Sequence, residues 1–163
     1  MEIKTGNIWD FETECTPIVV PTNIGWKSSG VNVMGRGIAK QAAERYPSLA
    51  LWYGNLCRQH WGGTPVVRHP DYPLVLFPTK PLNDTKPYYS WASRSDLELV
   101  EKSSKQLAAL ETTDQHIYVP LVGCGNGGLD VDDVFPVLQK YLNDDRFTLV
   151  VTNQDYQLIK ELL

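Results

Sequence analysis

The sequence predicts an α/β domain in which helices cover both faces of a largely parallel β-sheet. Strand-like apolar runs alternate with segments of helical periodicity over most of the 163 residues. The runs at 17–21 and 74–78 are continuously apolar, which is typical of parallel strands buried on both faces. No repeat, low-complexity segment or linker divides the chain, so we expect one domain over residues 1–163.

In the first half of the chain, helix-ending and helix-capping residues separate the expected elements. Pro47 ends one helix, Ser48 is expected to cap the next, and Gly62 with Gly63 ends that one. The expected elements are, in order, strands at 3–4 and 17–21 and helices over 35–46 and 49–61.

In the second half, a proline-rich stretch precedes a regular alternation of helices and strands. The capping-box pattern at 95–98 starts one helix, Asp130 or Asp132 starts the next, and Asn153 starts the closing one. The expected elements are strands at 66–67 and 74–78, a loop over 79–91, a helix over 97–110, a strand at 116–122, a helix to 142, a strand at 147–151 and a helix to 163.

Composition excludes several classes of protein. Hydrophobic residues make up 42% and charged residues 21%, which is unlike disordered chains or coiled coils. A net charge of −4 disfavours a non-specific nucleic-acid binder, although a local basic groove is compatible with it. No stretch is apolar over the length needed to span a membrane, and the N-terminus lacks the apolar core of a signal peptide. Three scattered cysteines suit a reducing compartment. We therefore expect a cytoplasmic protein without a membrane segment.

The glycines gather in two clusters that each follow an apolar strand. Four of the 12 lie in 25–37 and four in 123–128. Backbone N–H groups in such loops can bind phosphate, and a helix that follows adds its positive end. The alternative is that these glycines only permit tight turns. Neither the dinucleotide-binding glycine pattern nor a P-loop is present, which disfavours hydride transfer and NTP hydrolysis.

Five motifs resemble the macro domain family, whose members bind ADP-ribose. The resemblance is strongest to the branch of the terminal ADP-ribose glycohydrolases and of the antitoxins that remove ADP-ribose from DNA. It implies a three-layer α/β/α fold with a mixed, largely parallel sheet. The matching segments are Gly6-Asn7-Ile8, 19–23, 33–39, Thr79-Lys80 and 120–129.

The resemblance also implies a ligand-binding set. Asn7 stands where macro domains usually carry an adenine-binding aspartate, and the alternative is a turn residue after Gly6. Asn23 matches an asparagine that holds the distal ribose, and the alternative is an Asx-turn. The expected ligand-binding residues are Asn7, Ile8, Gly35, Arg36, Gly37, Ile38, Gly123, Cys124, Gly125, Asn126 and Gly127.

Lys80 and Asn23 are the catalytic candidates that the resemblance implies. A lysine amine can attack or position the anomeric carbon of ribose once it is deprotonated. The alternative for Lys80 is a solvated loop residue. In the terminal ADP-ribose glycohydrolases an aspartate acts with the lysine, whereas the matching position here is Gly127, as in the DNA-directed branch.

The remaining polar candidates are weaker. His60, His69 and His116 form no cluster with ligand spacing, so we expect neither a metal nor a cofactor. Cys124 is interpreted as a small packing residue, with a reactive thiol as the alternative. Trp91 and its aromatic neighbours are candidates for stacking on a base or a ribose.

Three functions follow from the resemblance. The first is hydrolysis of the bond between ADP-ribose and a modified protein or nucleic acid, which reverses ADP-ribosylation. The second is a phosphatase that acts on ADP-ribose 1″-phosphate, and the third is a non-catalytic ADP-ribose reader. Lys80 favours the first. The expected partner is ADP-ribose or its carrier, and we expect a monomer.

Overall fold

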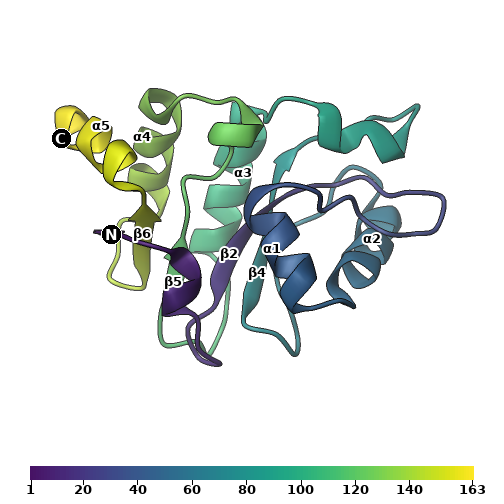
Figure 1. Cartoon of the computed structure of the whole chain (residues 1–163), viewed down its shortest axis with the longest axis horizontal. Helices are drawn as coiled ribbons and strands as arrows, with labels where there is room; N and C mark the ends of the chain where they lie inside the picture. The colour runs from purple at the N-terminus through teal and green to yellow at the C-terminus, as the bar shows by residue number, and fades with distance from the viewer.

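The computed structural model describes residues 1–163 and contains a six-stranded sheet (Figure 1). Its strands are β1 (Glu2–Thr5), β2 (Ile18–Asn23), β3 (Val67–Arg68), β4 (Leu74–Lys80), β5 (Ile117–Val119) and β6 (Phe147–Val151). They lie in the order β1-β6-β5-β2-β4-β3, and all neighbours are parallel except β3 with β4. The mixed, mostly parallel sheet confirms the predicted fold class.

Helices form a layer on each face of the sheet. The helices are α1 (Gly37–Arg45), α2 (Leu49–His60), α3 (Leu97–Ala108), α4 (Val131–Tyr141) and α5 (Asn153–Leu162), with short 3₁₀ helices η1 (Ile8–Phe11), η2 (Pro87–Ala92) and η3 (Gly125–Gly127). In β2, Val19 belongs to the core cluster that includes residues of α3, α4 and α5, whereas Ile18 and Val20 belong to the cluster that includes residues of η1, α1 and α2. Alternate residues of a buried strand thus serve the two layers. No helix combines the length and the apolar character needed to cross a membrane.

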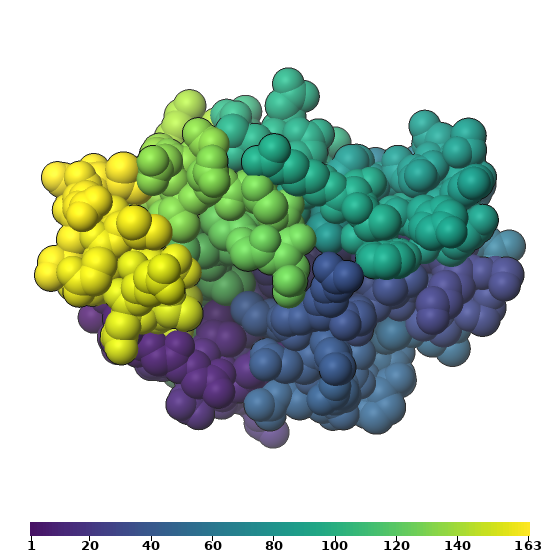
Figure 2. Space-filling view, turned by 45° about the horizontal axis from the view of Figure 1, so that its top comes forward, coloured from purple at the N-terminus to yellow at the C-terminus, as the bar shows by residue number.

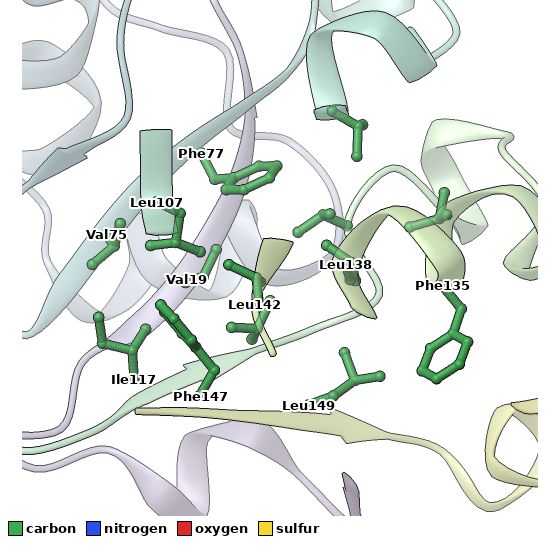
Figure 3. Packing of buried hydrophobic residues seen from close by; sticks show 14 of the residues in the cluster. Val19, Val75, Phe77, Leu107, Ile117, Phe135, Leu138, Leu142, Phe147 and Leu149 are labelled. Atoms are coloured by element: carbon green, nitrogen blue, oxygen red, sulfur yellow. The ribbon is translucent and has the colours of Figure 1, made fainter. Parts of the chain in front are cut away.

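The core beneath α3 and α4 fixes the strands that lead to the site. Phe77 of β4 and Phe147 of β6 are fully buried together with Leu107 of α3 and Leu138 of α4 (Figure 3). Burying each of these side chains stabilises the fold by about 1.5–3 kcal/mol. The carboxyl ends of the central strands are therefore held by a close-packed interior.

The predicted starts and caps of several helices differ from the structure in detail, by up to two residues. Asp96, and not Ser95, is the N-cap of α3, because its carboxylate accepts the N–H of Glu98 at 3.0 Å. Thr152 caps α5, so Asn153 is the first helical residue. The helix expected from Gly35 begins at Gly37, and the carboxylate of Asp130 precedes α4 without making a capping hydrogen bond.

Two further predictions need correction. Ser48 precedes α2 but does not cap it; its hydroxyl bonds the hydroxyl of Tyr72 at 2.7 Å. The strand expected over 116–122 contains only β5, because the chain turns at Pro120. Conversely, β4 continues beyond the predicted 74–78 and ends at Lys80, which places the side chain of this lysine at the edge of the sheet.

Candidate active site

A cleft of about 490 Å³ opens at the carboxyl ends of β2, β4 and β5. Its walls are the end of β2, the segment 33–39 that begins α1, the end of β4 with residues 91 and 95, and the segment 120–127. The blue, teal and green surfaces of these segments meet at the centre of the view in Figure 2. Because ligands of α/β proteins bind beyond the carboxyl ends of parallel strands, this cleft is the candidate site.

Most residues predicted from the sequence line this cleft. Both glycine clusters contribute, which confirms that they converge on one cavity. Those that line it are Asn23, Gly35, Arg36, Gly37, Ile38, Lys80, Gly123, Cys124, Asn126 and Gly127.

Asn7, Ile8 and Gly125 do not line the cleft. The side-chain oxygen of Asn7 accepts the N–H of Trp9 at 3.1 Å and caps η1, as expected of a turn residue. The side chain of Ile8 packs into the core on the α1 face of the sheet. An adenine contact by Asn7 stays a prediction.

The first turn of α1 presents free backbone donors to the cleft. The N–H of Lys40 makes the first helical hydrogen bond, to the carbonyl of Arg36 at 3.2 Å, so the N–H groups of residues 37–39 have no helical acceptor. Arg36 makes no side-chain capping bond to them. This uncapped end carries a partial positive charge and can bind an anion.

The loop 123–128 adds further donors beside α1. Gly123, Gly125 and Gly128 adopt φ values of +77°, +61° and +81°, which glycine tolerates best. The N–H groups of Gly123, Gly125 and Asn126 donate to no backbone acceptor. A Cβ on Gly37 would lie 3.4 Å from Asn126 Nδ2, so this loop and the start of α1 touch. Together they form a concave surface suited to a diphosphate.

Asn23 is held firmly by its own surroundings. Its Oδ1 accepts the N–H of Gly25 and an Nδ2 hydrogen of Asn32, each at 3.0 Å, and its Nδ2 donates to Val33 O at 2.8 Å. Since an amide nitrogen carries two hydrogens, one Nδ2 hydrogen is free for a ligand. Asn23 thus forms an Asx-turn through its Oδ1 and also lines the cleft with a free amide hydrogen.

Asn32, which no sequence pattern singles out, holds the segment around Asn23 in place. Its Nδ2 lies within hydrogen-bond distance of Asn23 O, Asn23 Oδ1 and Gly25 O, at 3.1, 3.0 and 2.8 Å. It is almost fully buried. The local sequence does not predict this role, because all three contacts join residues seven or more positions apart and depend on how the glycine-rich segment folds back.

The amine of Lys80 lies in the same cleft. Lys80 Nζ donates to the carbonyl of Trp91 at 2.7 Å, which leaves its other hydrogens free. Burial, and secondarily the nearby Arg36 guanidinium, lower the pKa of this amine. A lowered pKa increases the neutral fraction, which is the nucleophilic form of lysine.

A second cavity of about 310 Å³ adjoins the first and shares Lys80 and Arg36 with it. Arg36 also lies over the Trp91 ring, with 5.7 Å from its guanidinium carbon to the ring centre. Arg94 lines the outer side, where its Nε donates to Gly128 O at 3.0 Å. Two arginines, Lys80 and no carboxylate line this side cavity.

Cys124 lines the cleft as a neutral thiol. Burial, followed by the charges of Asp155, Asp130 and Asp133, raises its pKa to about 12. This agrees with the packing role and disfavours the alternative of a reactive thiol. No group of three or more His, Cys, Asp or Glu side chains is arranged to hold a metal ion.

No protein-family model matches the chain. Among curated proteins, the DNA ADP-ribosyl glycohydrolases of Mycobacterium tuberculosis and Mycobacterium bovis are 31% identical over 117 residues, or 64% of this chain. The chain spans 30% of the length of these relatives.

Solved macrodomain structures share the fold. The macrodomain of Mycobacterium tuberculosis DarG superposes with a TM-score of 0.68 at 26% identity, covering 92% of this chain and 97% of that one. The macrodomain of Thermus aquaticus DarG gives 0.65 at 26% identity, covering 93% and 97%. Thermosipho africanus DarTG in complex with ADP-ribose gives 0.70 at 21% identity, covering 96% and 44%. The chain therefore has the macro domain fold and is similar to the macrodomains of the DarG branch.

Proposed function

We propose that this macro domain binds ADP-ribose and hydrolyses the bond between its distal ribose and a carrier. The observation that carries the proposal is the position of Lys80. Its partly desolvated amine lies in one cleft with the free backbone donors of α1 and of loop 123–128. An anion held by these donors would leave the attached sugar within the same cavity as the amine.

In this proposal the backbone binds and Lys80 does the chemistry. The diphosphate is held by the N–H groups, and the free Nδ2 hydrogen of Asn23 orients the distal ribose. The neutral amine of Lys80 attacks the anomeric carbon as the bond to the carrier breaks, and the carrier leaves with the bonding electrons and takes up a proton. Water then hydrolyses the bond between lysine and ribose, which releases ADP-ribose and restores the amine. The hydrogen bond to Trp91 O limits where Nζ can lie.

A nucleic acid is the carrier that the side cavity favours. The cavity shares Lys80 with the cleft and is also lined by Arg36 and Arg94, without an opposing carboxylate. Such a lining attracts phosphate groups despite the net charge of −4. The curated relatives are named DNA ADP-ribosyl glycohydrolases, which agrees with this choice.

The test is a parallel release assay on three substrates: a protein ADP-ribosylated on a side chain, an oligonucleotide ADP-ribosylated on thymidine, and ADP-ribose 1″-phosphate. We expect release of ADP-ribose from the oligonucleotide and a loss of roughly 100-fold or more in kcat for Lys80→Ala. Lys102→Ala is the control, because Lys102 is exposed on α3 and outside the cleft.

Each outcome assigns a function. Full activity of Lys80→Ala would rule out the proposed mechanism. Turnover of ADP-ribose 1″-phosphate alone would identify the phosphatase, and binding without turnover of any substrate would identify a reader.

A further inference from the structure

The hydroxyl of Ser95 is buried in the wall of the cleft without a hydrogen-bond partner in the protein. The residue is only 5% exposed. Two other buried side-chain atoms lack a partner, Oδ1 of Asn32 and Oγ1 of Thr64, and neither residue lines the cleft. Because an unsatisfied buried hydroxyl is costly, its presence at a ligand site requires an explanation.

The backbone around Ser95 joins the two parts of the site. The N–H of Ser95 donates to Gly127 O at 2.8 Å, and the N–H of Asp96 donates to Thr79 O at 2.9 Å. Thr79 immediately precedes Lys80. The Ser95 side chain is therefore anchored between the end of β4, which carries the amine, and loop 123–128.

Because Gly127 has no side chain, the Ser95 hydroxyl fits against it. A Cβ on Gly127 would lie 2.4 Å from Ser95 Oγ and 3.2 Å from Ser95 Cβ. The hydroxyl thus packs directly against a glycine of the loop, where any larger residue at position 127 would displace it.

We propose that Ser95 Oγ hydrogen-bonds a hydroxyl of the distal ribose and helps to set this sugar against Lys80. The inference rests on the proposed function and extends it to a further substrate-binding residue. A serine hydroxyl both donates and accepts, which matches a sugar hydroxyl, whereas a diphosphate only accepts. The diphosphate already has the free N–H groups of α1 and of loop 123–128.

The experiment compares two ligands that differ in the distal ribose. ADP-ribose and ADP are titrated calorimetrically into the wild-type chain and into Ser95→Ala, and melting temperatures are measured without ligand. For Ser95→Ala we expect the Kd for ADP-ribose to rise about five-fold and the Kd for ADP to stay within two-fold. The melting temperature of the ligand-free variant should stay unchanged or rise by about 2–4 °C, because an unsatisfied hydroxyl is removed.

A matched control separates binding from stability. Thr64→Val removes a hydroxyl that is likewise buried without a hydrogen-bond partner, beside the Cys57 thiol and outside the cleft. It should leave both Kd values unchanged.

Three results would overturn the role of Ser95: equal weakening of ADP-ribose and ADP, unchanged affinity for both, or a lower melting temperature in Ser95→Ala with correspondingly weaker binding of both. If the wild-type chain binds neither ligand, the proposed function itself fails. Ser95→Cys, which keeps the shape but donates poorly, should reproduce the selective loss for ADP-ribose.

Discussion

Replacing Gly54 with alanine is expected to destabilise the protein, although alanine favours helices. Gly54 lies in α2, against the glycine-rich segment that follows β2. A Cβ at this position would lie 1.9 Å from Gly30 O and 2.6 Å from the backbone nitrogen of Asn32. Both atoms belong to the backbone, so α2 or the segment has to move as a unit.

The size of the effect follows from two opposing contributions. Alanine gains about 1 kcal/mol over glycine in a helix. Overpacking of a buried contact costs about 1–3 kcal/mol, and this backbone clash belongs at the upper end. The net loss is about 2 kcal/mol, which lowers the melting temperature of a chain of this length by about 4–8 °C.

Gly54→Ala should also weaken ligand binding in the cleft, because it displaces Asn32. Its side chain holds Asn23 and Gly25, so a displaced Asn32 weakens the binding of ADP-ribose as well. Thermal unfolding and calorimetric titration measure the two effects. Gly63→Ala is the control, since a Cβ there makes only an ordinary 3.5 Å contact with His60 O. An unchanged or higher melting temperature for Gly54→Ala would show that a Cβ fits at this contact between α2 and the glycine-rich segment.

Two predictions concern pH. Arg36→Gln removes a charge that, after burial, lowers the pKa of Lys80, so the acidic limb of the kcat/KM profile should shift to higher pH; an unshifted limb would mean that another group titrates. Burial also lowers the pKa of His69, whose Nδ1 accepts the N–H groups of Asp71 and Tyr72, each at 3.0 Å. The unfolded chain therefore binds this proton more readily, so stability is complete above about pH 6.5 and falls as the pH drops through the lower folded pKa. Urea unfolding at pH 7 and pH 5 should show this loss in the wild-type chain and a smaller one in His69→Gln.

The parts of the site that the sequence predicts are those encoded by local patterns. Glycines that follow apolar strands indicate loops at the carboxyl edge of a parallel sheet, and this edge is common to all such strands. The apolar run of β4 predicts that Lys80 lies near this edge, whereas the choice of Lys80 as a catalytic candidate comes from the family resemblance. The structure brings these segments to one cleft.

The parts that the sequence does not predict depend on contacts between distant segments. Ser95 reads as the first residue of a capping box, yet Asp96 caps α3 and the Ser95 hydroxyl packs against Gly127. Asn32 belongs to no recognisable motif. Its side chain can donate to Asn23 Oδ1 only because the segment between the two residues folds back. The side cavity likewise forms only where loop 123–128 lies beside residues 91–94. No local sequence pattern predicts that these two segments meet.

Calorimetric titration of ADP-ribose into the wild-type chain and Lys80→Ala separates binding by the backbone from catalysis by the lysine. Backbone donors of α1 and of loop 123–128 are proposed to hold the diphosphate, and these do not depend on the lysine side chain. We expect one-to-one binding of ADP-ribose to both proteins, with hydrolysis confined to the wild type. Absence of saturable binding to the wild-type chain would contradict the proposed function.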